Sequence, residues 1–224
     1  MATTKKASSK SKQIDDNRII AMYMDAVLSD NAVPKNVYLF CKAHQIEESD
    51  FYSFFGSFEN LKQVIWVKFF ENAVSTINKE EAYGTYSDKN KLLTLFYTLF
   101  EILTLNRSYV MFSMHENKNN LKNLKDLTLL RREFKEFIAN IIDENENVGA
   151  ANLDKITKPV FSEGAWIQFL LILKFWIDDT SKGFEKTDII IEKSVNTAVD
   201  VFNTKPLESL LDLGKFLWKE SKMR

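Results

Sequence analysis

The segment Asn36 to Leu61, NVYLFCKAHQIEESDFYSFFGSFENL, constrains the fold of this chain more than any other stretch. Apolar side chains recur at helical spacing from Val37 to Cys41 and again from Phe51 to Phe55, with a turn at Gln45 between them. Ser57 follows a glycine and is a candidate N-cap for another helix. The segment therefore predicts two short helices around a tight turn, followed by a capped third helix.

The remainder of the sequence predicts an all-α protein. Only 6 glycines and 3 prolines occur in 224 residues, and they fall between periodic apolar stretches rather than inside them. The periodicity predicts helices over about 13–29, 34–44, 47–54, 58–77, 88–105, 108–116, 120–144, 158–179, 186–203 and 206–222. Pro34 is expected at the first position of its helix.

Three domains are expected from the positions of the breaks. Residues 1–12 carry four lysines among Ser, Thr and Ala and predict a disordered basic tail, either solvated or reaching DNA phosphates. Residues 13–78 form a small head. The polar stretch that follows separates the head from a helical body over 87–224.

Composition and charge narrow the protein class. The formal net charge of −1 gives no overall attraction to nucleic acid, so DNA affinity would require a local patch. The single cysteine, Cys41, excludes an internal disulfide and is interpreted as a small buried side chain. The apolar run Trp166 to Ile177 is too short for the roughly 20 residues of a membrane span. We expect a cytoplasmic protein without a signal peptide and without stable membrane insertion.

The sequence offers little chemistry for catalysis. His44 and His115 have no second ligand at helical spacing, so no metal site is expected. Phosphate-binding glycine loops and nucleophile elbows are missing from the sequence, and the paired carboxylates fall at helix ends or on polar faces. We expect no enzyme activity and no cofactor.

The first 75 residues resemble the head of the TetR family of bacterial transcriptional regulators. The family pattern is close to T-V-x-x-I-A-x-x-A-G-V-S-x-G-x-L-Y-x-Y-F-x-S-K-E-x-L. The matching positions are Asn36-Val37, Phe40-Cys41, Ile46, Phe51-Tyr52, Phe54-Phe55, Ser57, Glu59 and Leu61. The resemblance implies a helix-turn-helix that reads a double-stranded DNA operator, and a body that binds an effector and forms a homodimer.

The head departs from the family pattern at positions that would contact DNA. Gln45 replaces the usual turn glycine, so it must adopt a positive φ or shift the turn. The recognition helix carries acidic side chains where basic side chains are expected. This change weakens contacts with the DNA phosphates. Tyr52 suits packing and DNA contact equally well. The resemblance assigns DNA contacts to Lys35, Asn36, Glu48, Ser49, Asp50, Tyr52, Ser53 and Lys62.

The body resembles that of the family more weakly. The last long pair of helices usually forms a four-helix bundle with a second subunit. Candidates for this dimer interface, which would otherwise pack within the monomer, are Phe169, Leu173, Trp176, Val195, Ala198 and Phe202. Candidates for a pocket that binds an apolar effector, which ordinary core packing also explains, are Phe96, Phe100, Met111, Phe112, Phe134, Phe137 and Trp166. The hypothesis is a one-component repressor whose effector moves the helix over 58–77.

A second hypothesis comes from the spacing D-x-S-x-x-F-x-x-T, here Asp179, Ser181, Phe184 and Thr187. It resembles ubiquinone-biosynthesis accessory proteins, which share the TetR fold but bind lipids. With the acidic recognition helix, this spacing supports a lipid- or isoprenoid-binding protein whose head no longer binds DNA. Capping of the following helix explains the same residues equally well.

Overall fold

The computed structural model describes residues 14–116, 123–143 and 154–202, and every regular element in these ranges is a helix. The predicted all-α class is confirmed. The helices group into two compact units, one of residues up to 65 with 108–126, the other of 66–107 and 127 onward. The predicted division into a head over 13–78 and a body over 87–224 remains a proposal.

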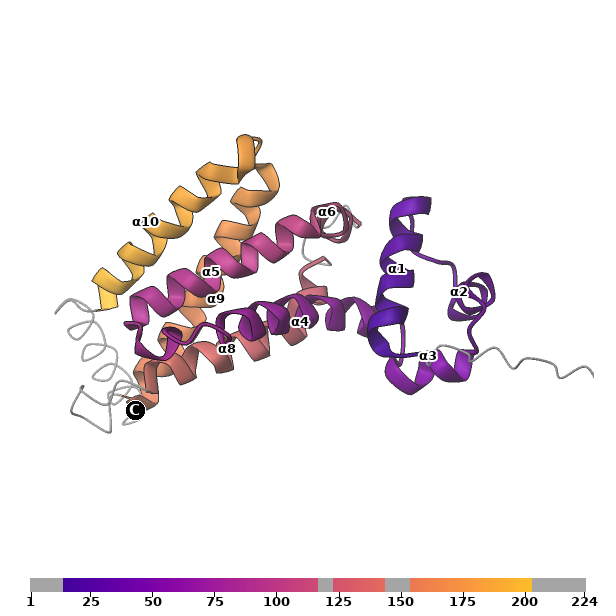
Figure 1. The fold of residues 1–224 in the computed structure, drawn as a ribbon, viewed down its shortest axis with the longest axis horizontal. Coiled ribbons are helices and arrows are strands. Elements are labelled where there is room, and N and C mark those ends of the chain that lie inside the picture. Colours follow the sequence, from indigo (N-terminus) through magenta and orange to yellow (C-terminus); the bar gives the residue numbers. More distant parts are fainter. Residues whose placement is uncertain (1–13, 117–122, 144–153, 203–224) are drawn as a thin grey trace, which may run out of the picture. The chain divides into compact units, whose positions relative to one another are not determined.

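The first unit, whose helices are drawn in Figure 1, is built around a cluster of aromatic rings. Phe58 lies at its centre, with ring centroids 5.4 Å from Tyr23 and 5.6 Å from both Phe40 and Phe51. These four rings come from four different helices and are at most 8% exposed, so they hold the helix-turn-helix together. The unit contains all of α1 (Asp16–Asp30), α2 (Val37–His44) and α3 (Glu48–Phe54). It also contains the first turns of α4 (Phe58–Ile77) and all but the first residue of α6 (Arg107–His115).

Side-chain caps fix where these helices begin. Asn36 Oδ1 accepts from the backbone N–H of Leu39 at 2.8 Å, and Ser57 Oγ accepts from that of Asn60 at 3.2 Å. The Ser57 cap is confirmed. The prediction that Pro34 opens the second helix is wrong, because the stronger Asn36 cap starts α2 at Val37.

Gln45 takes the left-handed conformation that the family pattern assigns to glycine. Its φ of 56° and ψ of 43° let the N–H of Ile46 reach the carbonyl of Cys41 at 3.1 Å. A side chain in this region costs roughly 1 kcal/mol. The turn is retained, and Ile46 remains buried between α2 and α3.

The second unit packs four long helices and the remainder of α4 around a second aromatic cluster. Phe134 on α8 lies 5.6 Å from Phe169, 5.8 Å from Trp166 and 6.1 Å from Phe96 between ring centroids. As predicted, the apolar helix over 88–105 lies deep in this core, with eight residues buried. The helices are α5 (Asp88–Leu105), α8 (Thr128–Asp143), α9 (Asp154–Asp178) and α10 (Glu185–Phe202), with the 3-10 helices η1 (Tyr83–Thr85) and η3 (Lys182–Phe184).

Two predicted helices in the body differ from the structure. The single helix expected over 120–144 is interrupted, because residues 124–127 form the 3-10 helix η2 (Leu124–Leu127) and α8 starts at Thr128; residues 120–122 lie outside the described residues. Helix α9 starts at Asp154 rather than 158, so Pro159 lies inside it. A proline this close to the start removes one backbone hydrogen bond, and the helix tolerates it. The predicted tail 1–12 and final helix 206–222 lie outside the described residues.

One described helix, Lys158–Asp178, is long and apolar enough to span a membrane by length and composition, and 39% of its most apolar window is buried. Core helices of soluble proteins pass the same test, so this is weak evidence for a span.

Candidate functional site

The surface of α2 and α3 carries most of the residues predicted to contact DNA. Lys35, Asn36, Ser49, Tyr52 and Ser53 are exposed, and Glu48 and Asp50 are half-buried. The structure thus brings these side chains to the outside of one helix-turn-helix. Three further exposed apolar residues there, Tyr38, Leu39 and Phe54, were not predicted as part of this surface; Tyr38 and Leu39 occupy the variable positions after the T-V step of the family pattern.

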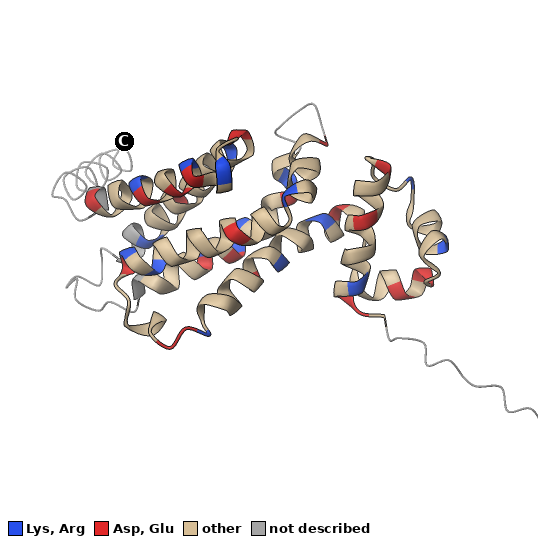
Figure 2. Cartoon of the chain, turned by 45° about the horizontal axis from the view of Figure 1, so that its top comes forward, with Lys and Arg blue, Asp and Glu red and all other residues tan. Residues whose placement is uncertain are grey.

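Charge on this surface is predominantly negative. Figure 2 shows red without blue on α3, because Glu48 and Asp50 are its only charged residues. Over residues 14–65 the sequence has four basic and eight acidic side chains. The hydroxyl of Ser53 already donates to the carbonyl of Asp50 at 2.7 Å. Phosphate contacts from this surface must therefore come from a few neutral donors and two exposed lysines, Lys35 and Lys42.

Lys62 does not belong to this surface. It is only 7% exposed, and its Nζ lies 3.0 Å from Glu116 Oε1 and 3.6 Å from Asp126 Oδ2, inside the first unit. Burial, together with Glu116, raises the pKa of Asp126 to about 6 although Lys62 opposes that shift. The prediction of a DNA contact for Lys62 is corrected, because its ammonium is held in this buried cluster.

The predicted effector residues are not gathered around one cavity. Phe96, Phe100, Phe134 and Trp166 are at most 6% exposed and pack against each other and Phe169, so ordinary core packing explains them. Met111 and Phe112 lie on α6, in the other unit.

Phe137 is the predicted effector residue that does line a cavity. A cleft of about 380 Å³ lies between α4 and α8, where the rings of Phe70 and Phe137 meet edge to face at 5.7 Å. Its rim carries Glu71, Glu133 and Glu136. The cleft therefore combines two aromatic rings with acidic groups, and one of its two helices, α4, also continues into the first unit.

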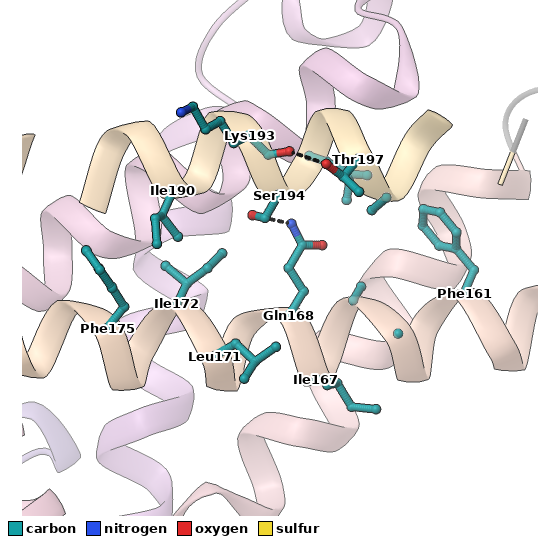
Figure 3. A pocket seen from close by; sticks show the side chains of 14 residues that line it. Phe161, Ile167, Gln168, Leu171, Ile172, Phe175, Ile190, Lys193, Ser194 and Thr197 are labelled. Atoms are coloured by element: carbon teal, nitrogen blue, oxygen red, sulfur yellow. Dashed lines mark hydrogen bonds between the residues drawn. The ribbon is translucent and has the colours of Figure 1, made fainter. Parts of the chain in front are cut away.

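A larger groove of about 720 Å³ runs between α9 and α10 (Figure 3). Its lining is almost entirely apolar. Ile167 and Leu171 on α9 are 53% and 64% exposed, which is unusual for large aliphatic side chains. The groove is lined by Leu92, Phe161, Gly164, Ala165, Ile167, Gln168, Leu171, Ile172, Phe175, Ile190, Lys193, Ser194, Thr197 and Ala198.

Most of the residues predicted for a dimer interface lie elsewhere. Phe169, Leu173, Trp176 and Val195 are at most 2% exposed and fill the core of the protomer, so their prediction as interface residues is corrected. Ala198 does line the groove, and the side chain of Phe202 lies outside the described residues. Helix α9 is apolar on two opposite sides, and the sequence pattern does not distinguish the side that faces the core.

The turn between α9 and α10 accounts for the D-x-S-x-x-F-x-x-T spacing. Asp179 accepts four hydrogen bonds, from the N–H and Oγ of Ser181 at 2.8 and 2.7 Å and from the N–H and Oγ1 of Thr187 at 3.0 and 2.7 Å. Burial favours a higher pKa, but these bonds outweigh it and lower the pKa of Asp179 to about 2. The motif caps the start of α10.

Phe184 contacts the side chain of Arg107, which stabilises the same turn. The guanidinium lies 4.3 Å from the ring centroid of Trp176 and 4.4 Å from that of Phe184. It also donates to the carbonyls of Trp176, Ile177 and Asp179, at 3.0, 3.1 and 3.4 Å, and so closes the end of α9. The contacts of this turn account for the D-x-S-x-x-F-x-x-T spacing without a bound ligand.

Comparison with known proteins supports the same fold. A family model described as the tetracyclin repressor-like C-terminal domain matches residues 91–217, more than half of the chain. No curated protein matches the sequence significantly.

Proposed function

The chain belongs to the TetR family of tetracycline repressor-like regulators, and from this premise we propose that it is a homodimeric, one-component repressor that binds DNA. The observation that carries the proposal is the family match over 91–217 together with a complete helix-turn-helix in α2, α3 and the Gln45 turn. In such a dimer two recognition helices enter successive major grooves one helical turn apart.

The proposed DNA surface comprises α3 and the start of α2. Lys35, Asn36 and Tyr52 would bind phosphates, since all three are exposed and carry hydrogen-bond donors, and Ser53 would do so by exchanging its bond to the Asp50 carbonyl for one to a phosphate. Glu48, Ser49 and Asp50 would face the bases, where carboxylates accept from the N4 amino group of cytosine. The lysines of residues 1–12 would supply positive charge that α3 lacks.

The proposed dimer uses the groove between α9 and α10. The exposed ridge of Ile167 and Leu171, with Phe175 and Ile190 beside it, offers the apolar area that a four-helix bundle buries. A second copy of the chain would cover this surface and leave the buried core residues of each protomer in place. This assignment replaces the core residues chosen from the sequence.

The proposed effector is a small molecule with apolar groups that binds the cleft between α4 and α8. Its rings, Phe70 and Phe137, and its volume of about 380 Å³ suit a small ligand. Because α4 also begins in the first unit, a ligand that displaces it would alter the spacing of two heads on DNA. We expect binding of the effector to release the operator.

A gel-shift measurement with the upstream promoter region at two salt concentrations tests the proposal. The full chain is compared with a variant in which Lys5, Lys6, Lys10 and Lys12 are replaced by alanine. We expect binding that weakens steeply with salt, and a shallower salt dependence in the variant. Failure to find salt-sensitive binding to any sequence would overturn the regulator proposal.

A lipid- or isoprenoid-binding protein with an inactive head is the second candidate. The acidic surface of α3 and the apolar groove between α9 and α10 favour it. The capping role of Asp179, Ser181 and Thr187 weakens its sequence argument. Native mass spectrometry of the purified protein distinguishes the two candidates: a retained lipid on a monomer supports the carrier, whereas an empty dimer supports the regulator.

A further inference from the structure

A polar pair, Gln168 and Ser194, links α9 to α10 within the largely apolar lining of the groove. Gln168 Nε2 donates to Ser194 Oγ at 2.9 Å, across the groove from one helix to the other (Figure 3). Ser194 Oγ in turn donates to the carbonyl of Ile191 at 3.2 Å. The hydroxyl proton of Ser194 is therefore used, and its oxygen is free to orient the Gln168 amide.

Gln168 retains unused hydrogen-bonding capacity in this position. A primary amide has two N–H donors and one carbonyl acceptor, and Ser194 uses one donor. Among the described residues, the second N–H and Oε1 of the Gln168 amide have no hydrogen-bond partner. If a partner surface covered the groove without matching these atoms, a buried amide would lose its water and gain nothing in return.

The position of this pair along the groove points to its partner. Among the described residues that line the groove, Phe161 and Phe175 are the first and last on α9, and Gln168 lies halfway between them in the sequence. Ser194 lies halfway between Ile190 and Ala198, the first and last described lining residues on α10. In a two-fold interface only residues at the axis meet their own copies, so an interface centred on this groove places Gln168 opposite itself.

We propose that Gln168 pairs with Gln168 of the partner subunit at the two-fold axis, and that this pair fixes the register of the homodimer; the inference rests on the proposed dimer. Two amides related by a two-fold axis exchange two N–H to oxygen bonds, while each keeps its bond to Ser194. All donors and acceptors of both side chains are then satisfied. A central polar pair in an apolar interface penalises shifted registers, which would bury the amides unpaired.

The test compares the full chain with Gln168→Glu by analytical ultracentrifugation at pH 7.5 and pH 5.0. Two carboxylates at the axis repel each other and also lose the N–H donors of the amide. We expect the dimer dissociation constant to rise at least about 100-fold at pH 7.5 and to recover partly at pH 5.0, where one carboxyl of the pair holds a proton. Asn72→Glu, an exposed α4 position outside the groove, adds the same charge and should leave dimerisation unchanged.

Two more variants separate a specific pair from a fold defect. Gln168→Leu should dimerise at least as tightly as the unsubstituted chain at both pH values, because it removes a polar group without adding charge. Ser194→Ala should weaken the dimer by a few-fold, since it releases the amide from its fixed orientation. A Gln168→Glu dimer as tight as the unsubstituted one at pH 7.5 would overturn the pairing alone. An unsubstituted chain that stays monomeric at high concentration would overturn the proposed dimer, and the pairing with it.

Discussion

The two units bury carboxylates in opposite ways. In the second unit Asp179 accepts four hydrogen bonds, and its pKa falls to about 2. In the first unit Asp126 shares the single ammonium of Lys62 with Glu116, and its pKa rises to about 6. Asp179 is 5% exposed and Asp126 is 7% exposed, so burial alone does not decide the direction of the shift.

The number of donors per carboxylate accounts for the difference. A buried carboxylate is stable when its lone pairs meet N–H and O–H groups, whereas one shared cation compensates two buried charges only in part. The hydroxyl of Tyr23, buried in the first unit, has no hydrogen-bond partner among the described residues. The hydrogen-bonded turn around Asp179 in the second unit therefore stabilises the fold, whereas the cluster of Lys62, Glu116 and Asp126 in the first unit is under-satisfied.

The largest effect is expected from removing the acceptor at the α9–α10 turn. Asp179→Ala leaves the N–H and hydroxyl of Thr187 buried without a partner, and should lower the free energy of unfolding by about 3 kcal/mol at pH 7. Urea unfolding measures the change. Because the pKa is lowered in the folded state, the stabilisation is complete above about pH 5 and is lost as pH falls from about 4 toward 2. A difference from the unsubstituted chain that does not shrink below pH 4 would contradict this account.

A smaller loss is expected at Arg107. Arg107→Met keeps an apolar stem between Trp176 and Phe184 but removes the bonds to three carbonyls at the end of α9. We expect a loss of about 2 kcal/mol in the free energy of unfolding. Arg132→Met is the matched control, because the Arg132 side chain is 69% exposed and, among the described residues, pairs only with its neighbour Glu133. Its effect should stay within about 0.5 kcal/mol.

In the first unit, Asp126→Asn should raise the free energy of unfolding rather than lower it. A carboxyl whose pKa is raised in the folded state stabilises the fold below about pH 4, and this contribution disappears as pH rises through about 6. The amide cannot ionise, so the variant should be more stable than the unsubstituted chain by about 1 kcal/mol at pH 7.5, with a smaller gain at pH 4.5. A less stable variant at pH 7.5 would mean that attraction to Lys62 exceeds the cost of burial.

Tyr23→Phe should have the smallest effect. The ring contacts with Phe40 and Phe58 remain, and the hydroxyl that is removed has no partner among the described residues. We expect stability within about 1 kcal/mol of the unsubstituted chain, either unchanged or higher. A thermal melt that shows a large loss would reveal a hydrogen bond to the Tyr23 hydroxyl and weaken the contrast between the two units.

The head was predictable because its determinants are local. The Asn36 and Ser57 caps lie three residues from the groups they bind, and Phe51 and Phe55 lie one helical turn apart. Gln45 is also determined locally, because the turn requires a left-handed backbone conformation that overrides the preference of glutamine for other regions. Local signals of this kind need no knowledge of the tertiary fold.

The contact surfaces were less predictable because they depend on distant partners. Lys62 resembles a surface base in the sequence, and only packing against Glu116 and Asp126 shows that it is buried. In α9, Phe169 and Leu171 are both apolar and only two positions apart, yet one is fully buried and the other is 64% exposed. A helix that is apolar on both sides gives no periodic signal for choosing between them.

The two-sided character of α9 also has a consequence for the amount of protein in the cell. In the proposed dimer, the apolar face of Leu171 is sheltered only when two chains meet, so the stability of each chain rises with its own concentration. At low copy number more chains would remain single, with this face open to chaperones and proteases. The abundance of the regulator would then be set partly by how tightly it pairs with itself.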